Sequence, residues 1–143
     1  MSVSGLGGEF ALIGMAESDV GIVPDKSPRE LCVQVTLDAI KDAGLTLGEV
    51  DGLITCNAFA EPIMYHAEAV AEYIGWQPRH CVTVNTGGGT TFMALNMAAA
   101  AIQAGILNGI EGDLYAELAG TFVRHDTHGA LGHADQRKLS PQP

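Results

Sequence analysis

Positive charge is scarce in this sequence. Its 143 residues include 7 Lys and Arg against 17 Asp and Glu, which gives a formal net charge of -10. This balance argues against a broad nucleic-acid or anionic-membrane surface, and a polyanionic ligand would need a local patch of the few basic residues. The N-terminal residues also lack the basic region and apolar core of a secretion signal. We therefore predict a cytoplasmic protein with no nucleic-acid partner.

A membrane span and paired cysteines are also missing. The apolar stretch at residues 91–107 is short for a span and contains Asn and Gln side chains, so it predicts a buried core helix rather than a membrane segment. Cys32, Cys56 and Cys81 are odd in number and form no CxxC pair, which excludes a disulfide scaffold and a common zinc motif. They are typical of small buried thiols in a reducing compartment. A reactive Cys56, at the end of a predicted strand, is the alternative.

The most informative stretch runs from His80 to Gly105. A β-branched segment at 81–84 predicts a buried strand, and the three glycines that follow at 87–89 predict a sharp turn. After Thr90 and its neighbour, both good helix caps, the sequence is rich in Ala, Leu and Met as far as residue 103. The stretch therefore predicts a strand, a glycine turn and a buried helix.

This glycine turn lacks the residues of the common nucleotide-binding loops. No Lys follows the glycines, so it is not a Walker loop, and the GxGxxG spacing of a dinucleotide fingerprint is absent. A helix start of this kind still offers free backbone N–H groups and positive dipole charge, which can hold an anion or a developing oxyanion. A packing role alone is the other interpretation, because such turns are common packing devices in α/β folds.

The rest of the chain predicts alternating strands and helices. A serine cap, a proline and a glutamate within residues 27–30 are a strong helix start. The predicted elements are a strand at 9–15, a helix at 28–43, a strand at 53–56, a helix at 63–74, a strand at 81–84 and a helix at 91–103. This βαβαβα alternation favours an α/β fold with parallel strands and helices on both faces. The site is expected where the strands end, near Cys56, Asn57 and Asn85.

We assign residues 9–106 to one α/β domain and residues 107–143 to an irregular, flexible tail. Within the domain, Gly14 predicts a close backbone approach, and His66 is predicted to lie on the surface. The tail contains the residue types of a metal site, namely His125, His128 and His133 with Asp126 and Asp135. Histidines in a flexible polar segment are usually solvated, so no metal site is predicted.

Two long segments resemble a known family. Residues 27–56, SPRELCVQVTLDAIKDAGLTLGEVDGLITC, and residues 71–105, AEYIGWQPRHCVTVNTGGGTTFMALNMAAAAIQAG, resemble the N-terminal half of the thiolase superfamily. They are most similar to the sterol-carrier-type and lipid-transfer-type branch. The resemblance implies a three-layer fold built from two similar α/β halves. It also implies dimers, and carbon–carbon bond chemistry next to a coenzyme A thioester.

The sequence departs from the thiolase pattern at the catalytic turn. In that pattern the turn before the buried helix carries a nucleophilic cysteine, which falls here on Gly88 or its neighbours. Glycine has no side chain, so covalent acyl transfer by this position is excluded, and no catalytic residue is predicted. The departure is shared by branches that perform aldol cleavage or act as non-catalytic partners. The family's later histidine- and cysteine-bearing motifs have no match in residues 107–143. A truncated or frame-shifted chain, inactive alone, is therefore expected.

The resemblance and the residues together predict a ligand-binding turn. Asn85, Gly87, Gly88, Gly89 and Thr90 are the predicted substrate-binding residues, with a coenzyme A thioester as the substrate and no separate cofactor. Two alternatives stay open. The chain is either a non-catalytic partner subunit, in a homodimer or a heteromeric complex, or a small anion-binding α/β module.

Overall fold

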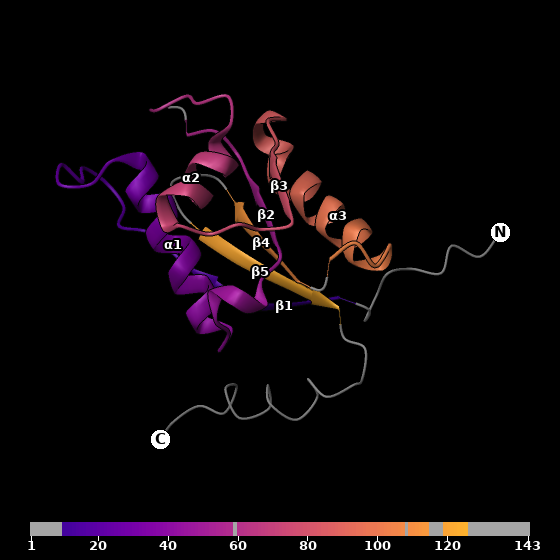
Figure 1. Cartoon of the computed structure of the whole chain (residues 1–143). Helices are drawn as coiled ribbons and strands as arrows, with labels where there is room; N and C mark the ends of the chain where they lie inside the picture. The colour runs from indigo at the N-terminus through magenta and orange to yellow at the C-terminus, as the bar shows by residue number, and fades with distance from the viewer. Residues whose placement is uncertain (1–9, 59, 108, 115–118, 126–143) are drawn as a thin grey trace, which may run out of the picture.

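The computed structural model describes residues 10–58, 60–107, 109–114 and 119–125. The strands are β1 (Phe10–Ala16), β2 (Gly52–Thr55), β3 (His80–Thr83), β4 (Gly109–Leu114) and β5 (Ala119–His125). The helices are α1 (Pro28–Asp42), α2 (His66–Ile74) and α3 (Thr90–Gln103). The short 3₁₀ turns are η1 (Leu47–Glu49) and η2 (Gly87–Gly89). The predicted order of strands and helices up to residue 103 is thus confirmed (Figure 1).

The five strands form one mixed sheet in the order β1-β5-β4-β2-β3. Strand β2 runs parallel to β3 and β4, whereas β5 runs antiparallel to both β4 and β1. Strands β1 to β4 therefore share one direction, as the alternation of elements predicts. Strand β1 lies at the edge of the sheet, where it pairs with β5 and is separated from β2 by two strands.

The segment after residue 106 differs from the predicted irregular tail. Residues 109–114 and 119–125 are strands, and they pair with each other and with β1 and β2. Their sequences, GIEGDL and AGTFVRH, mix glycines and charged residues, so neither shows the apolar run or clean alternation that identifies a strand. Pairing with distant strands gives them their conformation. Of the tail residues considered for a metal, His128, His133, Asp126 and Asp135 lie outside the described residues.

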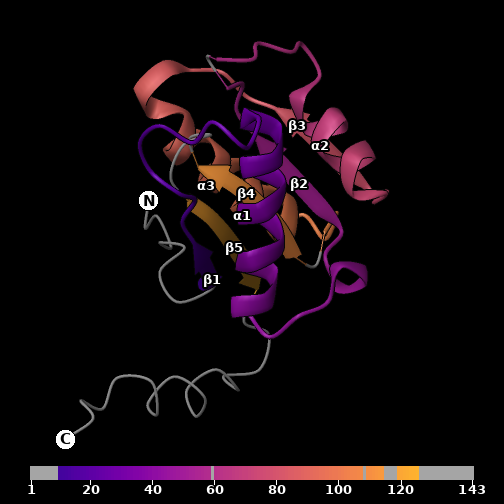
Figure 2. The ribbon, with the colours of Figure 1, turned by 90° about the vertical axis from the view of Figure 1, so that its left-hand side faces the viewer.

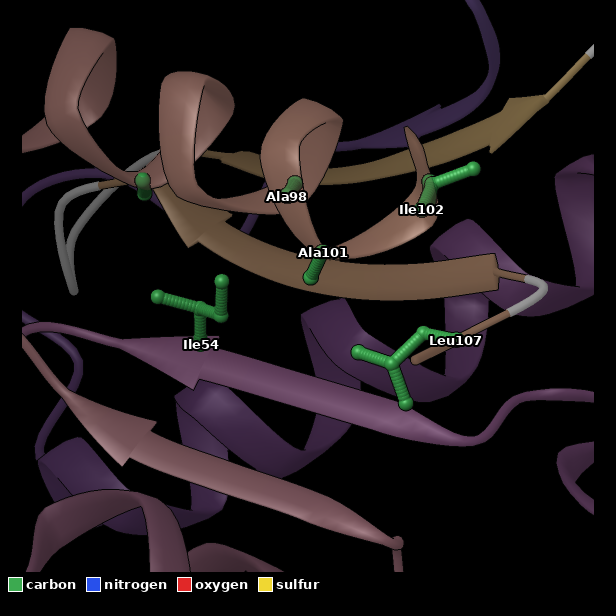
Figure 3. Close-up of a cluster of buried hydrophobic side chains, with 6 residues drawn as sticks. Ile54, Ala98, Ala101, Ile102 and Leu107 are labelled. Atoms are coloured by element: carbon green, nitrogen blue, oxygen red, sulfur yellow. The ribbon is translucent and has the colours of Figure 1, made fainter. Parts of the chain in front are cut away.

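Helices cover both faces of the sheet, which gives three layers. Figure 2 shows α1 crossing the face of the sheet that looks toward the viewer, with α3 behind the sheet. Helix α2 shares the face of α1, since residues of both pack on Leu53 of β2. The next residue, Ile54, packs on the opposite face against α3 (Figure 3). Successive side chains of a strand point to opposite faces, so β2 holds both layers together.

The two cores on β2 are fully buried. Leu53 and Ile54 are both 0% exposed. Leu53 packs in a cluster with Cys32 of α1 and with Ala67, Val70 and Ala71 of α2. Ile54 packs with Ala94, Ala98, Ala101 and Ile102 of α3 and with Leu107. The small alanine side chains let α3 approach the sheet closely, which explains the alanine-rich helix that follows the glycine turn.

Helix α1 begins as predicted and comes very close to β1. The Ser27 hydroxyl accepts a hydrogen bond from Glu30 N, and the Glu30 carboxylate accepts one from Ser27 N at 2.7 Å. These hydrogen bonds hold the pKa of Glu30 below its usual value. At the other end of α1, a Cβ added to Gly14 would meet the backbone of Ala39 and lie 2.8 Å from the Cβ of Ala43. The close approach predicted at Gly14 is therefore confirmed.

Candidate functional site

The ends of β2 and β3 bring the two predicted asparagines together. Thr55 and Thr83, the last residues of the two strands, lie opposite each other in parallel register. Beyond them, Val84 N donates to Thr55 O at 2.8 Å. Asn57 N then donates to the Asn85 side-chain oxygen at 3.1 Å. Because both loops leave the carboxyl edge of parallel strands, this edge is the expected place for a ligand in an α/β fold.

The glycine turn follows directly from this cross-link. Gly87 has φ +65°, a conformation that L side chains rarely adopt, and apart from its chain neighbours no atom of the described residues lies within 4 Å of the position its Cβ would take. Backbone conformation, not lack of space, therefore requires a glycine at this position. Asn85 and all three glycines are exposed to solvent. Four of the five predicted site residues thus lie on an open surface at the start of α3.

Thr90 has a different place from the other four. It is 4% exposed, and its hydroxyl accepts a hydrogen bond from Thr86 N at 2.9 Å and donates one to Gly87 O at 2.8 Å. Its side chain therefore closes the turn from inside. The predicted helix start is also shifted: Gly89 is the cap of α3, and Thr90 is its first residue.

The start of α3 favours a negative charge. The N–H groups at the start of a helix lack the i−4 partner and carry its positive dipole end, and here Thr90 N donates to Gly87 O within η2. No acidic residue lies in the first turn of α3 to neutralise this end. The three glycines present no side chain over it. This arrangement can donate backbone hydrogen bonds to an anion or to the oxygen of a polarised carbonyl group.

A buried histidine behind this edge was not predicted. His66, the first residue of α2, is 1% exposed, whereas the sequence analysis placed it on the surface. One ring nitrogen lies 3.2 Å from the Thr55 hydroxyl, and the other lies 4.0 Å from the Cys32 sulfur. Burial lowers the pKa of His66, Arg29 lowers it further, and Glu61 partly opposes them.

The helical spacing of the buried residues in α2 is the signal that identifies His66. His66 precedes Ala67 and shares a face with Val70 and Ala71, which are all buried. This is the i, i+1, i+4, i+5 pattern of a helix face that packs on a core. The polarity of histidine hides this pattern in the sequence. Arg29 and Glu61 lie near the ring and form an ion pair at 2.7 Å.

The cysteines are placed as structural thiols. Cys32 and Cys56 are buried, at 1% and 4% exposure. Burial raises the pKa of the Cys81 thiol to about 11, with a contribution from Glu68, so it stays protonated near neutral pH. A thiol reacts as its thiolate, so these environments favour the structural interpretation. In the described part of the chain, no group of three His, Cys, Asp or Glu residues could hold a metal ion. None of the described helices is both long and apolar enough to cross a membrane.

The comparisons with known proteins point to one fold. No protein-family model matches the chain. Its sequence is 29% identical over 103 residues to 17-hydroxy-3-oxo-4-pregnene-20-carboxyl-CoA lyase from Mycobacterium tuberculosis, covering 71% of this chain. The solved Ltp2-ChsH2(DUF35) aldolase has a TM-score of 0.63 and 28% identity over 73% of the chain. Acat5 thiolase from Ascaris suum in complex with coenzyme A has a TM-score of 0.60 and 20% identity over 73% of the chain.

This chain spans only part of these relatives. It covers 25% of the lyase, 27% of the aldolase and 29% of the thiolase. Within that part, the order of elements and the three layers agree with what the resemblance implies. The chain therefore has the thiolase fold, and the resemblance to the lipid-related thiolase-like proteins predicted from residues 27–56 and 71–105 is confirmed.

Proposed function

We propose that this chain is a thiolase-like protein of acyl-CoA metabolism whose glycine turn binds the thioester group of an acyl-CoA. The observation that carries the proposal is the exposed turn Gly87–Gly89 at the start of α3. It lies beside Asn57 and Asn85 at the carboxyl edge of β2 and β3. Carbon–carbon bond chemistry next to an acyl-CoA thioester is supported for the family by the lyase, the aldolase and the thiolase.

The turn would act by stabilising negative charge on the thioester oxygen. When a carbon–carbon bond next to a thioester carbonyl breaks, its electron pair passes to the α-carbon and is shared with the carbonyl oxygen. Backbone N–H groups that point at this oxygen stabilise the charge as it develops. The dipole of α3 adds to the effect. Asn85 stands next to the turn, with its side-chain oxygen already bonded to Asn57 N.

We further propose that the chain does not perform acyl transfer alone. By the resemblance, the family's nucleophilic cysteine falls on Gly88 or its neighbours, and the glycines of this turn offer no side chain. Cys56 and Cys81 do not replace it, since one is buried and the other keeps its proton. Catalytic groups would then come from a second polypeptide or a second copy of the fold.

The surface of α3 supports a partner. Phe92 and Met93 in its first turn are 70% and 44% exposed. Adjacent large apolar side chains that are open to solvent favour contact with another protein surface. Among the described strands, the edge strand β3 pairs with β2 alone. We therefore favour a cytoplasmic homodimer or heteromeric partner subunit over a small stand-alone anion-binding module. The first turn of α3 also lacks a basic residue that would favour a free phosphate.

A thermal unfolding titration with acetyl-CoA tests the proposed binding. A ligand that binds only the folded state stabilises it by about 2.7 kcal/mol at a hundredfold excess over its Kd, so the unfolding midpoint rises. Acetyl-CoA is expected to raise the midpoint more than free coenzyme A does, because only the thioester carbonyl reaches the turn. Gly87→Ala forces a side chain into φ +65° and is expected to abolish this difference.

Gly48→Ala is the matched control for this titration. Gly48 is exposed in η1, has no positive φ, and has open space around its Cβ position. Each variant is compared with its own ligand-free midpoint, so loss of stability is separated from loss of binding. An equal response to acetyl-CoA in the wild type and Gly87→Ala would overturn the proposed site.

A further inference from the structure

His66, at the start of α2, lies where α2 meets helix α1 and the ends of strands β2 and β3. Its ring is buried between the Thr55 hydroxyl of β2, at 3.2 Å, and the Cys32 sulfur of α1, at 4.0 Å. The next residue, Ala67, donates its backbone N–H to the Thr83 hydroxyl of β3 at 3.0 Å. The first two residues of α2 thus hold the last residues of β2 and β3, which face each other in the sheet.

The contacts continue from these strand ends into the ligand-facing loops. Thr55 O accepts from Val84 N at 2.8 Å, one residue before Asn85. Asn85 accepts from Asn57 N, and Thr86 N donates to the Thr90 hydroxyl that closes the turn. A hydrogen-bonded path therefore runs from His66 through Thr55 to the start of the glycine turn.

We propose that His66 is a positioning residue of the thioester site, which fixes the ends of β2 and β3 so that the glycine turn keeps the geometry that binds the carbonyl oxygen. This inference rests on the proposed function. His66 itself is buried and does not touch the ligand. It acts through Thr55, whose position sets the register of the loop that carries Asn85.

Burial of the ring favours the neutral imidazole of His66. Arg29 of α1 and Glu61 of the loop before α2 are the charged groups that act on it, and Cys32 faces it from α1. Burial and Arg29 together lower the pKa of His66 from its ordinary value of 6.5. Above pH 6.5 the ring is neutral in both the folded and unfolded chain, so its contribution to stability is complete. Below this value the unfolded chain binds the proton first, and the folded geometry is progressively lost.

Two variants of His66 separate positioning from packing. His66→Asn keeps an amide near the ring nitrogen that contacts Thr55, whereas His66→Leu keeps apolar volume and removes the hydrogen bond. We expect His66→Leu to weaken acetyl-CoA binding by about tenfold, which corresponds to about 1.4 kcal/mol. Binding by His66→Asn is expected to stay closer to the wild type. The wild-type affinity is expected to fall as pH drops below 6.5, and His66→Asn to lack this pH dependence.

A second pair of variants tests Thr55, the residue that His66 contacts. Thr55→Val removes the hydroxyl that faces His66 and is expected to weaken binding as His66→Leu does. Thr36→Val is the matched control, because Thr36 is 0% exposed on α1 and its hydroxyl has no hydrogen-bond partner among the described residues. Replacing that hydroxyl is expected to leave binding unchanged.

Amide hydrogen exchange at Gly87–Gly89 gives a readout that needs no ligand. Faster exchange at the turn in His66→Leu and Thr55→Val, with wild-type exchange in Thr36→Val, is the expected result. If wild-type protein ignores acetyl-CoA while the turn still responds in this way, the proposed function fails and the positioning role stands. If His66→Leu lowers only global stability and leaves exchange at the turn unchanged, the positioning role is overturned.

Discussion

Leu53→Ala is expected to lower the free energy of unfolding by about 2–5 kcal/mol, the range for deleting a buried leucine side chain. Leu53 is 0% exposed and lies on β2, between β3 and β4. Its neighbours Cys32, Val70 and Ala71 belong to α1 and α2, which cannot both move into the space that the variant leaves. The total free energy of unfolding of a protein domain is about 5–15 kcal/mol, so a large part of the stability depends on this side chain.

Denaturant unfolding of the wild type, Leu53→Ala and Leu37→Ala measures this effect. Leu37 on α1 is 40% exposed, so the same substitution there is expected to change stability far less. Equal losses in the two variants would show that the cluster around Leu53 is not the core of this face of the sheet.

Gly14→Ala is expected to destabilise the fold by about 1–3 kcal/mol through overpacking. The new Cβ would lie against the backbone oxygen of Ala39 and 2.8 Å from the Cβ of Ala43. To relieve this clash, β1 would have to move away from α1. The two elements are also joined by a 3.1 Å hydrogen bond from Met15 N to the Asp42 carboxylate. The consequence extends to β5, since β1 is its partner at the edge of the sheet.

The same alanine substitution at Gly48 is the control for Gly14→Ala. It adds a Cβ in open space without a change of backbone region, so it is expected to be neutral or slightly stabilising. Thermal unfolding midpoints of the two variants compare the effects directly. A wild-type midpoint for Gly14→Ala would contradict the close packing of β1 on α1.

Local signals in the sequence were sufficient for most of the fold. The capping residues Ser27 and Glu30 predicted the start of α1, and their reciprocal hydrogen bonds are present. Helix α2 ends at Ile74, the predicted end of that helix, and Gly75 with φ +76° is its cap. The β-branched run before the glycine turn predicted β3. These features depend on neighbouring residues, so they can be identified without knowledge of the tertiary structure.

The features that the sequence analysis missed depend on contacts between distant residues. Strand β5 pairs with β1 across more than a hundred positions, as in the Phe10–His125 pair, and its glycine and charged residues give no periodic signal. His66 is polar, so its burial became visible only with Thr55 and Cys32 around it. Likewise, the inward role of Thr90 follows from its hydrogen bonds to Thr86 and Gly87.

Acetylation of a cysteine placed at Gly88 tests most directly whether the turn binds a thioester. In Gly88→Cys, the thiolate would attack the carbonyl carbon of acetyl-CoA, the bond to the coenzyme A sulfur would break, and coenzyme A would leave as its thiol. Gly88 has no positive φ and is exposed, so a cysteine fits its backbone. Gly48→Cys, also exposed, supplies a thiol away from the turn, and the wild type measures the native cysteines. Intact-mass measurement is expected to show one acetyl group added to Gly88→Cys much faster than to either control. Acetylation of Gly88→Cys and Gly48→Cys at the same rate would contradict a thioester site at the glycine turn.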